Sequence, residues 1–331
     1  MTQKTYRALV AEEINGTFRQ QVKTVPIQNL PNHDVLTRVH YSSLNYKDAL
    51  SATGHKSVTK SYPFTPGIDA AGVVESSRDE RFEQGDKVIV TSYDLGMNTP
   101  GGFGQYISVP GDWILPLPDG LSLKESMIIG TSGLTAAIGV EKIVHHPIKT
   151  DDGDLLVTGA TGGVGSFAVG LLNQLGYSVT AATGKMDQAE FLKSVGASKI
   201  IHRDKVTDVD PKPLLSGKWI ASVDTVGGSM LDCVIRQTEH NGAVTCCGNV
   251  LGGELNTSIY PFILRGVSLM GIDSGIALME DRFRIWELLS NKWNPQFSGD
   301  LYRQTDLESL PEEIEKILAG KQIGKVLIRL G

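Results

Sequence analysis

The first 120 residues alternate short apolar runs with turn-forming residues. Three such runs, 35–39, 71–75 and 87–90, are rich in valine and other strand-forming residues, and the proline-rich segment 115–120 follows them. Short runs separated by Gly and Pro are typical of β-strands joined by turns. The pattern predicts a β-rich first part that folds as a partly open barrel.

The middle of the chain has a different rhythm, in which apolar runs alternate with helical segments. Leu155–Gly159 reads as a buried strand, and apolar residues recur at helical spacing over Gly163–Leu175. Tyr177–Thr183 predicts a second strand, and Asp187–Val195 a second helix with Asp187 as its N-cap. Further strands are predicted at 199–202, 220–224, 243–247 and 267–271. This alternation predicts a doubly wound parallel sheet with helices on both faces.

The last 60 residues predict two helices and a closing strand. The helices cover 278–289 and 307–318, and the strand covers 325–330. Because this strand follows the α/β block, we expect it to return to the β-rich first part.

The clearest functional pattern is the turn Gly-Ala-Thr-Gly-Gly-Val-Gly at 159–165, between the first strand and the first helix of the α/β block. A diphosphate needs backbone N–H groups at a helix N-terminus, and glycines let the backbone approach it closely. We therefore predict a dinucleotide site; the alternative is a turn that only permits tight packing. The predicted contacts are Gly159, Thr161, Gly162, Gly163, Val164 and Gly165.

The end of the second strand bears on the choice between NAD and NADP. An acidic residue about 20 residues past the turn would bind the ribose 2′-hydroxyl. Thr183 and Lys185 stand there instead, and both suit a 2′-phosphate, which predicts NADP(H) as the cofactor. The alternative for Lys185 is a solvated lysine at a helix start. Arg203, after the third strand, either stacks on adenine, reaches the same phosphate or is only a surface residue.

Several motifs in order resemble one enzyme family over nearly the whole chain. They are 43–48 (SLNYKD), 66–72 (PGIDAAG), 85–88 (GDKV), 130–136 (GTSGLTA) and 224–227 (DTVG). With the glycine turn, they resemble the quinone oxidoreductase branch of the medium-chain dehydrogenase/reductase superfamily. Residues 271–274 (GIDS) are similar to its subgroup of quinone reductases and bacterial acryloyl-CoA reductases.

This resemblance implies an α/β architecture in which a Rossmann domain is inserted into a GroES-like, partly open β-barrel domain. The implied catalytic domain comprises residues 1–123 and 273–331, and the NADP-binding domain comprises 124–272. The nicotinamide is expected in a cleft between the two domains.

Zinc-dependent relatives hold a catalytic ion with Cys and His in the N-terminal domain. This chain has Asn45-Tyr46 at the place of the cysteine and Ile68 at the place of the histidine, and its three cysteines all follow residue 230. We therefore predict no metal. Without a Lewis acid, an acceptor that is already electrophilic is favoured, such as a quinone, an enone or acryloyl-CoA.

The resemblance implies that the segment of Asn45, Tyr46 and Asp48 lies beside the nicotinamide. Asn45 is expected to bond the carboxamide or the substrate carbonyl, and Tyr46 to donate to the developing oxyanion, while Asp48 orients them. The alternative is a polar turn packed between domains.

The remaining predicted cofactor contacts lie near the ends of helices and strands. Thr131 and Thr135 are expected at the nicotinamide ribose; otherwise they are helix-start hydroxyls. Lys325 either contacts a cofactor phosphate or pairs with Asp69. The other three follow strands, where ligands bind in parallel sheets, and are Gly248, Asn249 and Ser274.

Composition narrows the partners. The net charge is −6 and no basic cluster is evident, which argues against nucleic acid and an anionic membrane surface. The sequence has no run of about 18 apolar residues, so we do not expect a membrane span. Cys233, Cys246 and Cys247 are too few and too close for a disulfide framework, which favours the cytoplasm.

The sequence thus predicts an NADPH-dependent oxidoreductase that acts on a small molecule. A homodimer is expected through the apolar edge strand 267–271 of the Rossmann sheet. The alternative is a non-catalytic NADPH-binding redox sensor, which would not need Asn45 and Tyr46.

Overall fold

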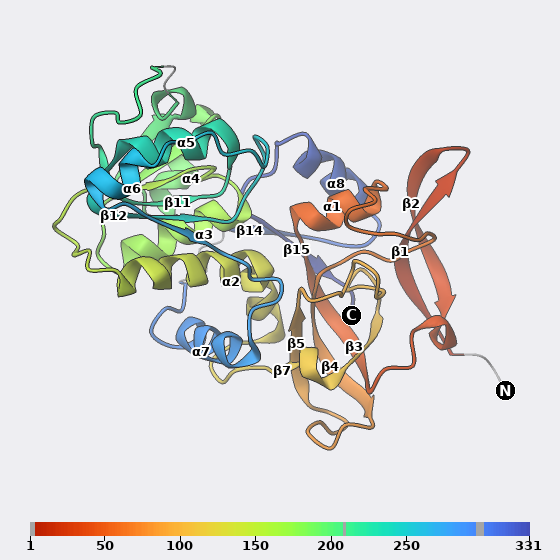
Figure 1. Cartoon of the computed structure of the whole chain (residues 1–331). Helices are drawn as coiled ribbons and strands as arrows, with labels where there is room; N and C mark the ends of the chain where they lie inside the picture. The colour runs from red at the N-terminus through yellow and green to blue at the C-terminus, as the bar shows by residue number, and fades with distance from the viewer. Residues whose placement is uncertain (1–3, 208–209, 296–300) are drawn as a thin grey trace. The chain divides into compact units, whose positions relative to one another are not determined.

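A computed structural model describes residues 4–207, 210–295 and 301–331. The chain divides into two compact units (Figure 1). The first unit consists of Met1–Thr131, Gly275–Asn291 and Tyr302–Gly331, and the second of Ser132–Ser274 and Lys292–Leu301. The chain thus changes unit after residues 131 and 274, whereas the predicted domains change after 123 and 272.

The first unit contains an antiparallel hairpin and a seven-stranded sheet. The sheet has the order β14-β15-β3-β4-β5-β7, and β6 also pairs with β3. The bounds are β1 Thr5–Ile14, β2 Thr17–Pro26, β3 Val35–Leu44, β4 Asp69–Ser77, β5 Lys87–Thr91, β6 Tyr106–Val109, β7 Leu115–Pro116, β14 Tyr302–Thr305 and β15 Lys325–Arg329.

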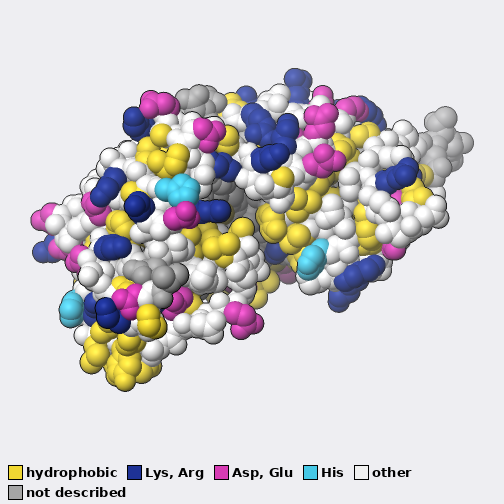
Figure 2. Space-filling view, turned by 90° about the horizontal axis from the view of Figure 1, so that it is seen from above, with side chains coloured by type: hydrophobic (Ala, Val, Ile, Leu, Met, Phe, Trp, Pro, Cys, Tyr) yellow, Lys and Arg dark blue, Asp and Glu magenta, His cyan; other side chains and the backbone are white. Residues whose placement is uncertain are grey.

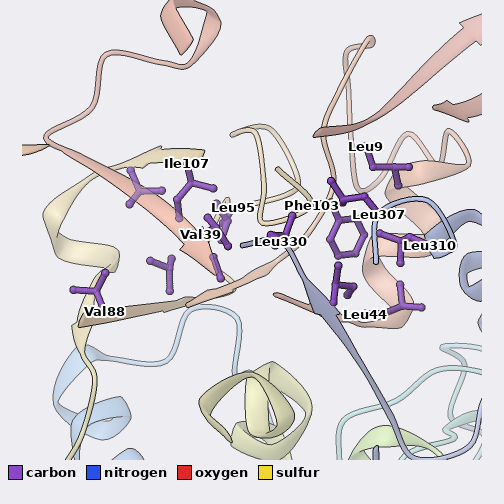
Figure 3. Packing of buried hydrophobic residues seen from close by; sticks show 14 of the residues in the cluster. Leu9, Val39, Leu44, Val88, Leu95, Phe103, Ile107, Leu307, Leu310 and Leu330 are labelled. Atoms are coloured by element: carbon purple, nitrogen blue, oxygen red, sulfur yellow. The ribbon is translucent and has the colours of Figure 1, made fainter. Parts of the chain in front are cut away.

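The two ends of the chain meet in this sheet. Strand β15 pairs antiparallel with β3, with Leu327 opposite Ser43, so the predicted return of the last strand is confirmed. Apolar side chains from both ends form one core, where Leu44, Phe103 and Leu310 lie together (Figure 3). Removing these side chains from water stabilises the pairing of the N-terminal and C-terminal segments.

Among the residues that the structure describes, three α-helices and the start of a fourth belong to the first unit. The bounds are α1 Tyr46–Ala52, α7 Met279–Ser290, α8 Leu310–Leu318 and α2 Leu123–His145, with short 3₁₀ turns at Ile27–Asn29 and Gly111–Trp113. Helix α2 is broken at Gly130, which has φ +49° and ψ −160°. The chain passes to the second unit just after this break.

The second unit contains a parallel six-stranded sheet with the order β10-β9-β8-β11-β12-β13. This is the doubly wound order in which the chain moves outward from β8 in both directions. Right-handed crossovers therefore place α3 and α5 on opposite faces, as Figure 1 shows. The bounds are β8 Leu155–Val157, α3 Gly163–Gln174, β9 Val179–Thr183, α4 Ala189–Ser194, β10 Lys199–His202, β11 Trp219–Asp224, α5 Gly228–Gln237, β12 Thr238–Cys246, α6 Tyr260–Arg265 and β13 Ser268–Gly271.

The predicted N-cap of the second helix is wrong. A 3₁₀ turn covers Met186–Gln188, and α4 begins at Ala189 without a side-chain cap. The Asp187 carboxylate instead accepts a hydrogen bond from the Gln188 side chain (2.8 Å). Asp187 lies inside this 3₁₀ turn, two residues before α4, so its side chain does not cap the helix.

Strand β13 ends the sheet order, so the predicted edge strand is confirmed. Large apolar side chains on and before the nearby helix α6 are exposed, and Figure 2 shows hydrophobic side chains gathered at its lower left, on the side where Figure 1 draws α6. They include Val250, Ile259, Tyr260, Ile263 and Leu264. An apolar surface of this kind is typical of an interaction face. Self-association through the edge stays a prediction.

One helix among the described residues, α2, is long and apolar enough to cross a membrane, with a mean hydropathy of 1.4 over its best window. Within the structure 78% of that window is buried. A soluble protein's core helix passes the same test of length and composition.

Candidate functional site

The glycine turn of the second unit has the geometry of an anion site. Gly159 has φ +58°, and a Cβ there would lie 2.3 Å from Thr225 Oγ1; a Cβ on Gly165 would lie 2.3 Å from the Gly159 oxygen. Helix α3 begins at Gly163, and its N-cap, Gly162, provides no side-chain cap. The first-turn amides and the helix dipole are therefore available to a diphosphate, which the turn fits.

The buried carboxylate of Asp224 fixes the end of the strand next to this turn. Asp224, the last residue of β11, accepts hydrogen bonds from Thr158 Oγ1 (2.7 Å) and the Gly227 amide (2.7 Å). Burial raises the pKa of Asp224, and these hydrogen bonds oppose the rise. The carboxylate joins the ends of neighbouring strands β8 and β11. The motif at 224–227 pointed to a family but gave Asp224 no role.

The tip of β9 brings together the residues predicted to bind a 2′-phosphate. The Thr183 hydroxyl is buried, lies 3.3 Å from that of Thr161, and accepts a hydrogen bond from the Lys185 amide (3.0 Å). Lys185 itself is half-buried, and burial lowers the pKa of its ammonium. A threonine hydroxyl and a lysine therefore lie together at this tip, one strand from the glycine turn.

Three other predicted cofactor residues also lie at this end of the second unit's strands. A Cβ on Gly248 would lie 1.9 Å from the Thr225 oxygen, so only glycine fits there, and Asn249 after it is exposed. Ser274 follows β13, and its hydroxyl lies 2.6 Å from that of Thr135. Their contacts with a cofactor stay predictions.

The first unit holds a buried polar network centred on Asp69. Its carboxylate accepts hydrogen bonds from Ser43 Oγ (2.5 Å), Asn45 Nδ2 (2.8 Å) and Thr131 Oγ1 (2.6 Å). The ammonium of Lys325, 1% exposed, lies 3.7 Å from Asp69 Oδ2 and donates to Asn45 Oδ1 (2.9 Å). The Asn45 carboxamide thus bridges the carboxylate and the ammonium.

A second carboxylate lies beside this network. Asp48 is fully buried and accepts hydrogen bonds from the amides of Ile68 (2.7 Å) and Asn45 (2.8 Å). Burial and the neighbouring Asp69 carboxylate raise the pKa of Asp48 to about 7, while Lys325 opposes the rise. Burial lowers the pKa of Lys325. Two acids and one lysine therefore lie out of water, and the lysine compensates one negative charge, which accords with the raised pKa of Asp48.

The residue at which α2 breaks, Gly130, lies against this network. A Cβ on Gly130 would lie 2.6 Å from both Asp69 Oδ2 and Ser43 Oγ, and 3.2 Å from Lys325 Nζ. The positive φ of Gly130 is also one that glycine adopts readily. The Thr131 amide that follows donates to Asp69 (3.0 Å). The missing side chain of Gly130 therefore makes room for the buried ion pair.

The structure shows which contacts several of the predicted site residues make in the first unit. Of the two alternatives for Lys325, the structure contains the pair with Asp69, at 3.7 Å, while a contact with a cofactor phosphate stays a prediction. Thr131 bonds Asp69 within the first unit, and Asn45 and Asp48 are held in the same network. Tyr46, by contrast, begins α1 and is 41% exposed.

Sequence reasoning missed the central place of Asp69 and the parts of Ser43 and Gly130. All three stand in the family-like motifs, yet only Asp69 was mentioned, as one partner for Lys325. The motifs identified the residues, but their proximity depends on pairing between segments far apart in the chain.

The cysteines have the character of core residues. Burial and the Asp224 carboxylate raise the pKa of Cys247 to about 12 and also raise the pKa of Cys246. Their thiols are therefore protonated at neutral pH and poor nucleophiles. In the part of the chain that the structure describes, no group of three or more His, Cys, Asp or Glu side chains could hold a metal.

Two family models match the chain. Residues 31–119 match the alcohol dehydrogenase GroES-like domain, and residues 163–291 match the zinc-binding dehydrogenase model. Acrylyl-CoA reductase AcuI of Ruegeria pomeroyi is 39% identical over 98% of each chain. YhfP of Bacillus subtilis, whose name assigns it provisionally to the quinone oxidoreductases, is 44% identical over 98% of this chain and 99% of its own.

The chain belongs to the medium-chain dehydrogenase/reductase superfamily. The predicted family and the predicted fold are thereby confirmed, and the protein is an oxidoreductase of this superfamily. The Escherichia coli YhdH structure with bound NADPH has a TM-score of 0.94 at 39% identity, covering 98% of this chain and 100% of that one. The B. subtilis YhfP structure with bound NAD has a TM-score of 0.95 at 43% identity, covering 99% and 100%.

We expect Lys325→Met to lower the free energy of unfolding of this superfamily member by ~3–5 kcal/mol, because it leaves two buried carboxylates without their cation. Chemical denaturation measures the change. Lys193→Met is the control: its ion pair with Glu190 is exposed on both sides, 62% and 88%, and should contribute less than ~1 kcal/mol. Equal stability of the two variants would contradict the role of Lys325 in compensating buried negative charge. Adding Asp69→Asn to Lys325→Met should recover part of the loss.

Proposed function

We propose that the protein is a zinc-independent, NADPH-dependent reductase that transfers hydride to an activated acceptor. The acceptor class is a quinone or an α,β-unsaturated carbonyl compound, such as an enone or acryloyl-CoA, and the proposed location is the cytoplasm. The observation that carries the proposal is the joint arrangement of the glycine turn with Thr183 and Lys185 at the tip of the next strand. Full-length relatives that are named for these two acceptor classes support it.

The choice of NADPH rests on charge at the tip of β9. A 2′-phosphate carries negative charge, which an ammonium and a hydroxyl stabilise and a carboxylate would repel. Lys185 and Thr183 supply that ammonium and hydroxyl. A structure of YhdH with NADPH supports this choice, while the YhfP structure with NAD makes cofactor preference worth measuring directly.

The choice of a metal-independent reaction rests on the first unit's network. Asn45 and Ile68 stand where zinc-dependent relatives carry ligands, and the Asp69 carboxylate is already compensated by a buried ammonium. A divalent cation beside Lys325 would meet electrostatic repulsion in a medium of low polarity. The acceptor must then carry its own electron sink, as quinones and unsaturated carbonyls do.

NADPH, when bound, would supply the hydride. An unsaturated carbonyl that accepts hydride at its β-carbon becomes an enolate, because the C=C pair shifts to the bond between the α-carbon and the carbonyl carbon and the C=O π pair moves to the oxygen. The protein's contribution is to orient the acceptor and to stabilise that oxyanion. Tyr46 is the proposed donor, because its phenol is exposed at the start of α1. Asn45 and Asp48 hold this helix start in place through their hydrogen bonds. The α-carbon then takes a proton from Tyr46 or from water.

A non-catalytic NADPH-binding redox sensor is the alternative from a different class. It would need the glycine turn and the tip of β9 but not an exposed phenol beside a rigid polar network. Catalytic turnover of an acceptor separates the two.

We expect NADPH consumption with at least one member of a parallel panel of acryloyl-CoA, simple enones and 1,4-quinones, measured at 340 nm. The rate with the best acceptor should be unchanged by EDTA. Binding of NADPH without consumption on the whole panel would favour the sensor. Loss of activity on chelation, restored by zinc, would overturn the metal-independent mechanism.

With the best acceptor, Tyr46→Phe should lower kcat on the order of 10²-fold, because it removes one oxyanion donor and keeps the ring. The Kd for NADPH should hardly change, since the diphosphate turn lies in the second unit. Tyr260→Phe, at a tyrosine of similar exposure, is the matched control. A Tyr46→Phe variant with the parental kcat would remove Tyr46 from the mechanism and leave water as the proton source.

The parent should bind NADPH at least ~10-fold more tightly than NADH, a ratio that corresponds to about 1.4 kcal/mol. Lys185→Ala should reduce this ratio, because it removes a cation from the 2′-phosphate site. Fluorescence titration with both cofactors measures it, and Lys193→Ala, an exposed lysine on α4, is the control. Equal affinity of the parent for NADPH and NADH would overturn the assignment.

A further inference from the structure

A buried arginine joins two distant segments of the first unit. Arg282, on α7, is 2% exposed. Its Nη1 donates to the Thr91 carbonyl oxygen (2.9 Å), its Nη2 to the Gly275 oxygen (2.9 Å) and its Nε to the Ala277 oxygen (3.1 Å). The planar fork of N–H groups of a guanidinium suits several acceptors at once. This side chain therefore fixes the segment 275–278 against the end of β5.

The flat face of the same guanidinium lies over an aromatic ring. Arg282 Cζ is 4.2 Å from the centroid of the Tyr93 ring, and that ring stacks on Trp113, with 5.7 Å between centroids and 8° between planes. A cation over a ring is held more strongly where both are removed from water. The Tyr93 amide also donates to the Gly275 oxygen (3.0 Å). Both the backbone and the ring of Tyr93 thus help to hold the segment.

The backbone that carries this ring has an unusual conformation. Ser92 and Tyr93 have φ +62° and +52°, in the left-handed region that residues with side chains seldom adopt. Two such residues in succession persist only where their surroundings fix them. The Ser92 hydroxyl lies 3.0 Å from Thr131 Oγ1, which donates to the Asp69 carboxylate that also binds Asn45. The held segment is therefore tied to the network at the start of α1.

The side chains that this framework holds in place are apolar and exposed. Ile276 is 73% exposed and Leu278 is 63% exposed. The segment follows the end of β13, and ligands bind at that end of the strands in parallel sheets. Apolar side chains kept in water on a fixed backbone are typical of a binding surface whose conformation is set before the ligand arrives.

We propose that Arg282 is a positioning residue for the acceptor. It holds the segment 275–278 so that Ile276 and Leu278 contact a hydrocarbon substituent of the acceptor. The segment is joined to the network that places Tyr46, the proposed oxyanion donor, and this connection favours the acceptor over a protein partner as the occupant. The inference rests on the proposed function and names, within it, acceptors that carry an alkyl group beside the reacting carbonyl.

The kinetic test uses alkyl vinyl ketones whose methyl, ethyl and butyl members differ only in the hydrocarbon group. At saturating NADPH, kcat/KM of the parent should rise ~2–4-fold for each methylene, through a lower KM, because each CH₂ group leaves water. In the double variant Ile276→Ala, Leu278→Ala the rise should fall below ~1.5-fold for each methylene. Ile14→Ala, at an exposed isoleucine on the hairpin of the same unit, is the control and should keep the parental rise.

Arg282→Lys tests the positioning role, because it keeps the charge and loses the fork that joins three carbonyl oxygens. Thermolysin, which cleaves before large apolar residues, should cut the segment 275–278 ~10-fold faster in this variant than in the parent, as measured by mass spectrometry of the fragments. The dependence of KM on chain length should be lost, while kcat/KM with methyl vinyl ketone stays within ~2-fold of the parent. A merely structural role would lower kcat/KM with every member alike. Arg284→Lys, at an exposed arginine of the same helix, is the control.

Several results would overturn the inference. If the parent turns over the whole series with one kcat/KM, or if the double variant keeps the parental rise, the segment does not bind the acceptor, and the proposed function stands without it. If the double variant keeps the rise and changes the oligomeric state in light scattering, a second copy of the chain covers the segment. If the segment in Arg282→Lys resists thermolysin as the parent does, Arg282 does not position it. No NADPH consumption with any acceptor would overturn the proposed function and the inference together.

Discussion

Compensation of buried charge is the constraint on which the first unit depends. Asp48 and Asp69 lie out of water, and the ammonium of Lys325 supplies one positive charge beside them. That lysine comes from the last strand, so the chain's end must return to β3 for the acids to be compensated. The same network explains why α2 breaks at Gly130, because an added side chain would occupy the place of the ion pair.

The second unit is organised around a site for an anionic dinucleotide, in which uncharged backbone amides face the diphosphate. Its strands all end at one edge of the sheet, and the glycine turn, the tip of β9 and the end of β10 lie at that edge. The backbone amides of the glycine turn suit a diphosphate, and the proposed source of cofactor preference is the side chains at the tip of β9.

Much of the fold could be predicted from the spacing of apolar residues and from the positions of glycine and proline. The strand at 199–202 and the helix starting at Gly163 were predicted at their observed places, because strong apolar periodicity and glycine both act locally. The predicted cap at Asp187 was wrong, because a 3₁₀ turn over Met186–Gln188 precedes α4 and contains this residue. The site was predicted as a set of residues and motifs. The choice between the two roles of Lys325 was left open, because it depends on the register between β15 and β3 and on burial.

The most direct test of metal-independent hydride transfer uses NADPH that carries deuterium at C4, in the position that is transferred. The deuterium is then followed into the product. The protein is first treated with EDTA, and the reduced product of an enone or acryloyl-CoA is analysed by mass spectrometry and NMR. The account predicts deuterium at the β-carbon of the product, in the amount of NADPH consumed, and solvent hydrogen at the α-carbon. A product without deuterium at the β-carbon, or transfer only after zinc is restored, would contradict it.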